Sequence, residues 1–323
     1  MKDFFKILSL FIDGDIPFER VFGGSKRRFY RIWDNDKSYI ILEDEDSAEL
    51  VRYAKLLQNL LHYGIPVPDV YAVDESHNGG MMLMEDIGSL SLFDWYRQMN
   101  DIEPHLRAAK VLAKIHRLGD VPGKVKSDFD IPDLLYETQY FIRHFLVGYC
   151  DYPDGVGDAL MDEFYRLARI AAHSPKGLMH RDFQSQNIFI APGTVRIVDF
   201  QGARRGFPAY DLASLIEDPY LNLPESAGKM IMDTYLSDAD MDKYEREMFL
   251  DSYPYLAIQR LLQATAAYAY LSKIEGKWWF EQFIIPALER TYKWLYTIDD
   301  FPILEDILTD VMKMIRLKVY LEI

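Results

Sequence analysis

The sequence of 323 residues lacks several features that mark particular protein classes. Cys150 is the only cysteine, so no internal disulfide can form and a reducing compartment such as the cytoplasm is favoured. No run of about 18 apolar residues occurs, so no membrane span is expected. Residues 1–15 have no basic segment and no small-residue cleavage site, which argues against a signal peptide.

Basic residues are also scarce relative to acidic ones. Lysine and arginine number 36 against 51 aspartates and glutamates, which gives a formal net charge of -15. This balance argues against a nucleic-acid partner or an anionic membrane surface. It would suit a cationic substrate, although a solvated acidic surface is the commoner cause. With 49% hydrophobic residues, the chain can build a large core, as two domains or as one domain with a smaller lobe.

The first quarter of the chain reads as strand, strand, helix, strand, strand. Residues 18–43 are rich in aromatic and β-branched residues interrupted by turn sequences, which predicts a hairpin. Residues 47–64 show apolar residues at helical spacing and end at Gly64, a natural helix stop. Residues 65–75 and 79–88 read as two further strands.

After Gly88 the patterns become mainly helical. They place helices within residues 91–99, 104–119, 132–149, 255–274 and 278–298. The aromatic residues of the last two segments are expected to be core stripes. No repeat and no low-complexity linker separates the two halves, so we expect one lobe over residues 1–87 and a second over residues 88–323.

One cluster of polar residues stands out inside the second half. His180, Arg181 and Asp182 are consecutive, Asn187 follows five positions after Asp182, and Asp199 comes twelve positions after Asn187. Short strand-like segments flank them. This is the arrangement of a kinase catalytic loop followed by its metal-binding acid.

The chemistry of phosphoryl transfer accounts for these residue types. A carboxylate such as Asp182 can orient a nucleophilic hydroxyl and accept its proton. Magnesium must neutralise the triphosphate of ATP and prefers oxygen ligands, which Asn187 and Asp199 would supply. His180 and Arg181 would support the loop from behind.

The motifs resemble the aminoglycoside phosphotransferase and choline kinase superfamily more than the protein kinases. Asp-Phe-Gln stands at 199–201 where protein kinases have Asp-Phe-Gly, Tyr-Asp-Leu-Ala follows at 210–213, and no Ala-Pro-Glu or long activation segment occurs. Within the superfamily, residues 25–32, 82–88, 180–188, 199–203, 210–220 and 258–271 resemble the bacterial kinases that phosphorylate N-acetylmuramate and N-acetylglucosamine at the anomeric hydroxyl in cell-wall recycling.

The resemblance implies an α+β, bilobal, protein-kinase-like fold, with a small mainly β N-terminal lobe carrying one helix and a larger mainly α C-terminal lobe. It implies ATP and Mg²⁺ as cofactors and a small hydroxylated substrate. It makes Asp182 the catalytic base, Asn187 and Asp199 the magnesium ligands, and Asp211 a brace for the catalytic loop, for which a surface or N-cap role is the alternative. The nucleotide would meet a phosphate loop and an interlobe hinge, formed by Gly23, Gly24, Ser25, Lys26 and Arg28 and by Met84, Glu85 and Asp86. The phosphate loop, taken alone, also fits an exposed hairpin turn.

The sequence departs from the family pattern in the third strand. Kinases of this class carry a lysine there that grips the α- and β-phosphates, whereas Leu42 or Glu43 falls at that place. We hypothesise that Lys26, Arg27 or Arg28 supplies the missing charge. Glu49, the candidate partner of such a lysine, is expected to be an exposed helix residue.

The acceptor is less well defined by the sequence. Glu137, Arg143, Arg204 and Arg260 are candidate substrate contacts, with a solvated turn as the alternative for Arg204. The leading hypothesis is a kinase for the anomeric hydroxyl of an amino sugar. An aminoglycoside or other small-alcohol phosphotransferase and a nucleotide-binding pseudokinase are the alternatives. We expect a monomer or a weak homodimer.

Overall fold

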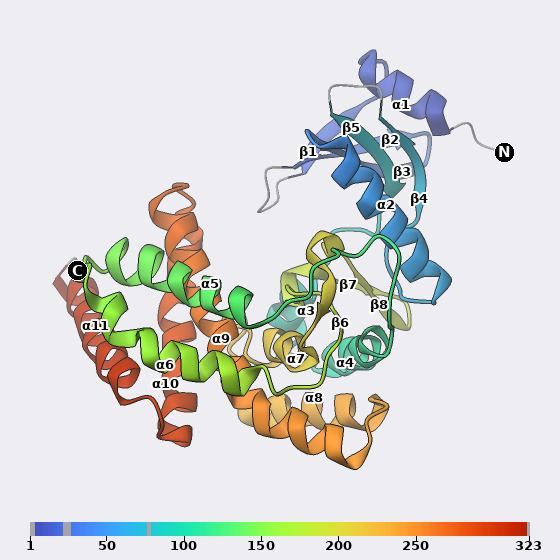
Figure 1. Cartoon of the computed structure of the whole chain (residues 1–323). Coiled ribbons are helices and arrows are strands. Elements are labelled where there is room, and N and C mark those ends of the chain that lie inside the picture. The colour runs from blue at the N-terminus through green and yellow to red at the C-terminus, as the bar shows by residue number, and fades with distance from the viewer. Residues whose placement is uncertain (1–3, 22–26, 76–78, 322–323) are drawn as a thin grey trace.

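The computed structural model describes residues 4–21, 27–75 and 79–321 and consists of a small β-rich lobe and a larger helical lobe (Figure 1). The elements of the small lobe are α1 Phe4–Ile12, β1 Phe18–Val21, β2 Arg28–Asp34, β3 Lys37–Asp44, α2 Ser47–His62, β4 Val70–Asp74 and β5 Gly80–Glu85. The bilobal α+β architecture is therefore the one expected from the sequence.

The larger lobe is built from helices, with two pairs of short strands and two short 3-10 helices around residues 177–206. Its elements are α3 Leu92–Met99, α4 Glu103–His116, α5 Ile131–Phe141, the π-helix η1 Ile142–Val147, α6 Val156–Ala171, β6 Gly177–Met179, η2 Ser185–Asn187, β7 Ile188–Ala191, β8 Thr194–Ile197, η3 Phe200–Gly202, β9 Arg204–Gly206, α7 Pro208–Ile216, α8 Glu225–Asp238, α9 Lys243–Lys273, η4 Trp278–Phe283, α10 Ile284–Ile298 and α11 Pro302–Leu321.

The sheet of the small lobe is antiparallel, with strand order β1-β2-β3-β5-β4. Side chains alternate between its two faces, as the pleat requires. Ile41 and Leu83 pack on one face under α1, whereas Leu42 and Met82 pack on the other face with α2. Helix α1 is absent from the sequence prediction, in which its apolar run figures only as a possible signal peptide.

Helix α2 confirms the prediction for residues 47–64. The side chain of Asp46 accepts a hydrogen bond from the Glu49 backbone N–H at 3.0 Å and caps the first turn. The helix ends before Gly64, whose φ of +69° is easily adopted only by glycine. Since α2 is covered on one side by the sheet and on the other by the helical lobe, it lies between the two lobes.

Helix α9 is the axis of the helical lobe. It has 31 residues, begins with a capping box between Asp242 and Glu245, and packs against α5, α6, α7 and α10. Tyr268 is buried in this helix, in agreement with the predicted core stripe. The same prediction is wrong for Trp278 and Trp279, which are 64% and 44% exposed and lie in the short 3-10 helix η4 between α9 and α10.

The apolar core does not stop at the lobe boundary. One cluster of buried side chains runs from Leu42 and Met82 in the sheet, through α2, to Leu112 in α4 and Leu212 in α7. A second core joins α5, α6, α9, α10 and α11. Within the described residues, no helix is both long and apolar enough to cross a membrane.

The packing of α2 gives a first prediction, on stability. Gly123 has a φ of +91°, and a Cβ there would lie 2.5 Å from the Leu56 backbone nitrogen and 2.8 Å from the Arg52 carbonyl oxygen, both in α2. Replacing Gly123→Ala should therefore lower the free energy of unfolding by roughly 2 kcal/mol or more. Thermal melting measures this change. Gly119→Ala, in the same loop with no atom within 4 Å of its added Cβ, is the matched control and should melt close to wild type.

Candidate active site

Two loops meet because of how the short strands of the helical lobe pair. Strand β6 pairs antiparallel with β9, with Met179 opposite Arg204, and β7 pairs antiparallel with β8, with Ile188 opposite Ile197. The loop between β6 and β7 and the loop between β8 and β9 therefore leave these pairs at the same end. Two hydrogen bonds join the loops, from the Val198 N–H to the Asn187 carbonyl at 3.0 Å and between His180 Nε2 and the Val198 carbonyl at 2.8 Å.

Asp182 lies at the centre of this junction, with both carboxylate oxygens held. Oδ2 accepts hydrogen bonds from Asn187 Nδ2 at 3.0 Å and from Gln184 Nε2 at 3.1 Å. Oδ1 accepts one from Arg260 Nη2 at 2.8 Å. The side chain keeps 40% of its surface exposed, so the held carboxylate can still be reached by a substrate.

Asp199 lies across the junction from Asp182 in an unusual backbone conformation. Its φ is +71°, in the left-handed region that non-glycine residues rarely adopt outside functional sites. Burial, and then the nearby Asp182 carboxylate, raise the pKa of Asp199 above its ordinary value. Two carboxylates held this close repel each other, and a bound cation would relieve that repulsion.

Asn187 completes a set of oxygen donors that fits magnesium. Its Nδ2 is used by Asp182, to the backbone carbonyl at 2.9 Å and to the side chain at 3.0 Å, which turns its Oδ1 away from that carboxylate. Among the described residues, no group of three or more His, Cys, Asp or Glu could hold a metal. One amide and one carboxylate therefore fit Mg²⁺, which takes few protein ligands and fills the rest with phosphate and water, better than they fit zinc.

Asp211 in α7 fixes the catalytic loop. Its two carboxylate oxygens accept hydrogen bonds from the backbone N–H groups of His180 at 2.5 Å and of Arg181 at 2.7 Å. Arg181 has a φ of +82°, so these bonds hold a strained turn. Asp211 is fully buried, and His116 Nε2 lies 3.2 Å from Oδ2 while its Nδ1 bonds the Tyr235 hydroxyl at 2.8 Å. A surface role for Asp211 is excluded.

A second buried acid, Asp218, holds the other end of the loop and does not figure in the sequence prediction. Its oxygens accept hydrogen bonds from the Ser185 and Tyr220 backbone N–H groups, each at 2.9 Å. The sequence offers little to find it, because Asp-Pro after a helix reads as an ordinary turn. His116 and Asp218 are therefore residues that only the folded arrangement connects to the loop.

The candidate substrate contacts divide into two groups. Arg260 reaches the loop directly through Asp182, and its Nε donates to Ser214 Oγ at 2.8 Å. Glu137 is buried one layer behind, where it accepts hydrogen bonds from the Tyr210 hydroxyl at 2.9 Å and from Arg181 Nη2 at 3.4 Å. Arg204 pairs with Asp133 at 3.2 Å, and Arg143 is exposed on η1.

The hinge residues lie at the end of β5. Arg31 binds the Asp86 carboxylate at 2.6 and 3.2 Å. Burial acts to raise the pKa of Asp86, but Arg31, Ser38 and the Gly88 backbone N–H together hold it below its ordinary value. Glu85 binds Arg196, and its backbone N–H donates to the Asp69 carbonyl at 2.8 Å. The Glu85 N–H is therefore already used, and Met84 is paired with a strand on each side, opposite Ile40 and Val70. The backbone groups that remain to meet a ligand are those from Asp86 onward.

The candidate substitutes for the third-strand lysine come from the segment that enters β2, the neighbour of β3 in the sheet. Gly23, Gly24, Ser25 and Lys26 lie outside the described residues. Arg28 is half-exposed and pairs with Glu43 at 2.9 Å, away from the loops. The Arg27 side chain is only 11% exposed and binds Asp44 at 2.6 Å and Glu49 at 3.4 Å.

Arg27 also lies near Asp199, one of the two candidate magnesium ligands. Its guanidinium lies 5.2 Å from the centre of the Tyr53 ring, and the phenol of Tyr53 lies against the backbone of Asp199 and Phe200. The positive charge of Arg27 is close enough to Asp199 to oppose the rise in the pKa of that carboxyl. Of the two candidate cations that the structure describes, Arg27 and Arg28, Arg27 is the one that lies near Asp199.

Glu49 is not the exposed residue that the sequence suggests. Besides Arg27, it binds Arg52, whose Nε lies 2.7 Å from Glu49 Oε2. Arg52 in turn donates to the Gln201 carbonyl at 2.6 Å and to the Gly123 carbonyl at 2.5 Å. The prediction for Glu49 was wrong because its helix faces the other lobe, and this chain of contacts ties α2 to the segment that carries Asp199.

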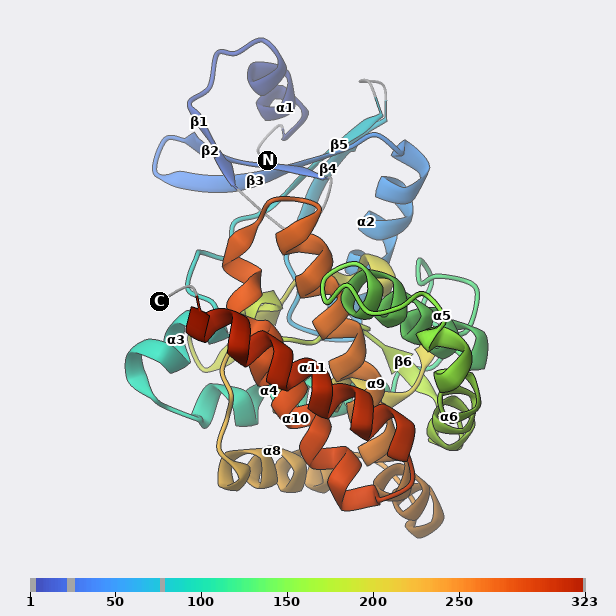
Figure 2. The ribbon, with the colours of Figure 1, turned by 90° about the vertical axis from the view of Figure 1, so that its left-hand side faces the viewer.

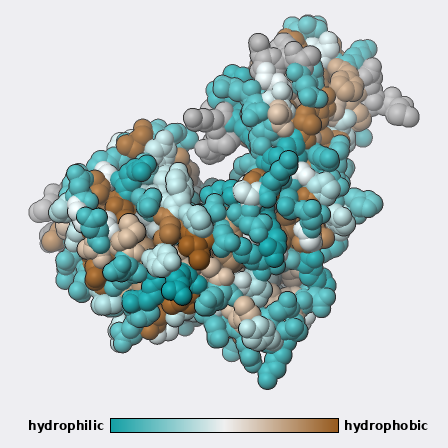
Figure 3. Space-filling view, viewed as in Figure 1, coloured by the Kyte–Doolittle hydropathy of each residue, from teal (hydrophilic) through white to brown (hydrophobic). Residues whose placement is uncertain are grey.

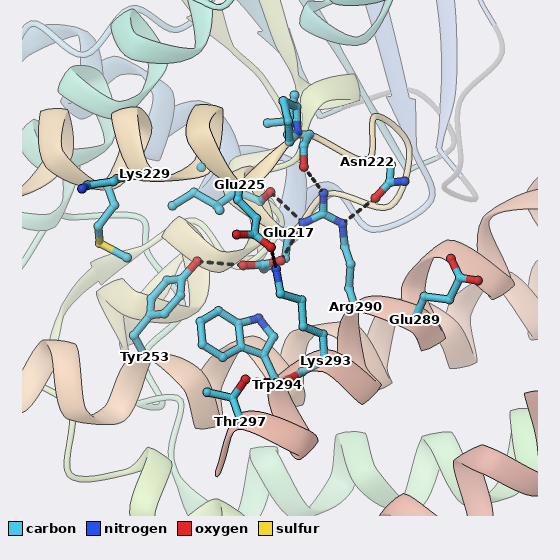
Figure 4. Close-up of a pocket in the computed structure, with 15 residues that line it drawn as sticks. Glu217, Asn222, Glu225, Lys229, Tyr253, Glu289, Arg290, Lys293, Trp294 and Thr297 are labelled. Carbon is cyan, nitrogen blue, oxygen red and sulfur yellow. Dashed lines mark hydrogen bonds and ion pairs between the residues drawn. The ribbon is translucent and has the colours of Figure 1, made fainter.

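Figure 3 shows a notch between the small lobe and the outer part of the helical lobe. A separate cavity of about 600 Å³ lies elsewhere, between α8, α10 and the end of α7, and none of Asp182, Asn187 and Asp199 lines it (Figure 4). Its charged groups are largely paired with one another, as Arg290 with Glu217 and Lys293 with Glu225.

Residues 19–249 match the phosphotransferase enzyme family. The chain is 25% identical over 264 residues to an N-acetylmuramate/N-acetylglucosamine kinase of Pseudomonas aeruginosa, covering 78% of this chain and 76% of that protein. It is 23% identical to the protein of the same name from Neisseria meningitidis, covering 78% and 77%.

Solved structures share the fold. A choline/ethanolamine kinase family protein from Mesorhizobium loti superposes with a TM-score of 0.60 at 17% identity, covering 92% of each chain. Spectinomycin phosphotransferase, solved with ADP and spectinomycin, superposes with a TM-score of 0.59 at 14% identity, covering 96% of this chain and 98% of that one.

The clamp on the catalytic loop gives a second prediction. Asp211→Asn replaces an acceptor oxygen by an NH₂ group that faces a backbone donor, so one hydrogen bond is lost and the strained Arg181 turn is released. We expect a loss of roughly 2–4 kcal/mol in the free energy of unfolding. Denaturant unfolding measures it. Asp233→Asn, on the exposed side of α8, is the control, and an equally small change in both variants would contradict the proposed clamp.

Proposed function

Because this chain belongs to the phosphotransferase enzyme family, we propose that it is an ATP-dependent kinase that phosphorylates a hydroxyl of a small molecule, with the anomeric hydroxyl of N-acetylmuramate or N-acetylglucosamine as the first candidate. The observation that carries the proposal is the convergence of Asp182, Asn187 and Asp199 at one end of two strand pairs. The names of the curated relatives support the amino-sugar acceptor.

In this proposal Asp182 is the catalytic base. Its two oxygens are held by Arg260, Asn187 and Gln184, so the carboxylate is fixed before a substrate arrives. A held carboxylate orients the attacking hydroxyl and accepts its proton as the new bond to phosphorus forms. Positioning of this kind contributes most of the rate acceleration in phosphoryl transfer.

Asn187 and Asp199 are the proposed magnesium ligands, through Oδ1 and the carboxylate. When bound, magnesium neutralises the charge of the triphosphate. Asp199 needs a partner of this kind, because burial and Asp182 both disfavour its charged form. Asp211, His180 and Arg181 have the supporting role of holding the loop at the required distance from Asp199.

The small lobe, residues 1–87, is proposed to bind the nucleotide, and residues 88–323 the acceptor. The adenine would meet the backbone from Asp86 onward, next to Leu83 and Met84. The phosphates would meet the segment 23–26 and Arg27. Arg27 replaces the absent third-strand lysine, and Glu49 keeps the partner role that a helix glutamate has in related kinases.

A substrate panel tests the function directly. ADP release should be measured with N-acetylmuramate, N-acetylglucosamine, kanamycin, choline and homoserine as acceptors. We expect turnover with at least one of the two amino sugars. Turnover only with kanamycin or only with choline would replace the amino-sugar proposal, and no turnover with any acceptor would favour a nucleotide-binding pseudokinase.

The catalytic base gives a third prediction. Asp182→Asn keeps the shape of the side chain but cannot accept the proton, so kcat should fall roughly 100- to 10,000-fold. Nucleotide binding, measured by calorimetry, should stay within a few-fold of wild type. A variant that keeps its kcat would remove Asp182 from the proposed role.

The relocated cation gives a fourth prediction. Arg27→Gln removes the charge beside the phosphates and should raise the KM for ATP about ten-fold or more, with a smaller effect for Arg27→Lys. Arg28→Gln is the matched control, because Arg28 is half-exposed and pairs with Glu43 on the surface. If Arg28→Gln raises the KM for ATP and Arg27→Gln does not, the phosphate charge belongs to Arg28 instead.

A further inference from the structure

Two neighbouring tryptophans, Trp278 and Trp279, are exposed, whereas many other aromatic side chains of the helical lobe are buried. Trp279 in η4 keeps 44% of its surface exposed. One side of it is covered by aromatic rings, of which Tyr220 is stacked with it at a centroid distance of 5.8 Å and an interplanar angle of 21°. Phe93, Phe280 and Phe283 contact it edge-on. The ring is thus fixed in place with part of its surface left open.

The turn that carries Trp279 borders the space between the lobes. Element η4 joins α9 to α10, and Figures 1 and 2 show that the end of this helical hairpin points toward the small lobe and stands below its sheet. Arg260, which holds Asp182, lies on the same helix α9. Helix α9 therefore carries Arg260, which contacts Asp182, and leads into η4, which carries the exposed ring.

Tyr220 connects the exposed ring to the catalytic loop. Its backbone N–H donates to Asp218, and Asp218 also holds the Ser185 N–H of the loop. Tyr220 also lies near enough to the catalytic carboxylate that, after burial and Asp218, Asp182 contributes to raising the pKa of its phenol. Of the stacked pair, Tyr220 is therefore the residue near Asp182, and Trp279 lies on the far side of Tyr220.

The segment carrying Tyr220 is held from behind by Arg290. Figure 4 shows this guanidinium inserted between the two ends of the segment. It donates to Glu217 at 2.7 Å, to Asn222 Oδ1 at 3.1 Å and to the Leu223 carbonyl at 2.6 Å. Tyr220 is presented by a short segment pinned on both sides, which is the kind of rigid support that a binding surface needs.

We propose that Trp279, backed by Tyr220, is one wall of the acceptor site and stacks on the apolar C–H face of a pyranose ring or its acyl substituent; this inference rests on the proposed kinase function. The acids near the loop favour such an acceptor over a cationic one. Asp218 already accepts hydrogen bonds from two backbone N–H groups, and Glu137 is already bonded to Tyr210 and Arg181. A flat aromatic wall suits a ring, whereas a short linear alcohol gains little from it.

The experiment compares Trp279→Ala with Trp278→Ala in the wild-type background. Trp278 is its neighbour on the same turn and is more exposed, at 64%, so its removal is the matched control. We expect Trp279→Ala to raise the KM for the sugar on the order of ten-fold, with the KM for ATP unchanged, because the lost stacking affects the acceptor alone. Trp279→Phe should restore most of the affinity, and Trp278→Ala should match wild type.

The outcomes separate this inference from the proposed function. Turnover of an amino sugar by wild type together with an unchanged sugar KM in Trp279→Ala would overturn the inference and leave the function intact. A joint change in sugar KM, ATP KM, kcat and melting temperature would also overturn it, since Trp279 would then act only in packing. Absence of wild-type turnover with any sugar would instead defeat the proposed acceptor class.

Discussion

The carboxylate of Asp211 is the constraint on which the catalytic loop depends. It accepts two backbone hydrogen bonds, from His180 and Arg181, and the second of these residues has a positive φ. A loop in that conformation is unfavourable by itself and persists only where the surroundings fix it. His116, from a helix almost a hundred residues earlier in the chain, contacts the same carboxylate and joins the loop to the core of the helical lobe.

On the small-lobe side of the proposed site, the positive charge is carried by a different residue from the third-strand lysine of related kinases. The third strand offers Leu42 to the core and Glu43 to the surface, so neither residue can bind phosphate. Arg27 enters the same region from the start of the neighbouring strand, and Glu49 meets it from α2. Binding of the phosphates requires a positive charge at a particular place. A residue from another segment can supply this charge if the fold brings its side chain to that place.

The contacts of Arg52 join these two sides. This residue binds Glu49 in its own helix and the Gln201 carbonyl next to Asp199, so the position of α2 and the position of the metal-binding segment are coupled. The apolar core, which runs without a break from the sheet through α2 to the helical lobe, has the same effect. The lobes therefore share one core, although their elements differ in class.

Much of the site can be predicted from local sequence, because a catalytic loop is a short segment with fixed spacing. Asp182 and Asn187 lie between β6 and β7, and Asp199 lies between β8 and β9, so their convergence follows once the two strand pairs form. The helix 47–62 and the strands around it are equally local, since a hydrophobic period of 3.6 or 2 is visible without knowledge of contacts. Helix α1 is missed, although its apolar residues also follow a helical period, because its short run is interpreted only as a possible signal peptide.

The contacts of the remaining residues are decided only by tertiary structure. Glu49 looks like an exposed helix residue until the second lobe covers it, and Trp279 looks like a core residue until its segment proves to be a turn. The sequence by itself determined the reaction class, because phosphoryl transfer demands particular side chains at particular local spacings. The fold decided which of Arg27 and Arg28 lies near Asp199 and which acid is buried, because those properties depend on distances between segments that are remote along the chain.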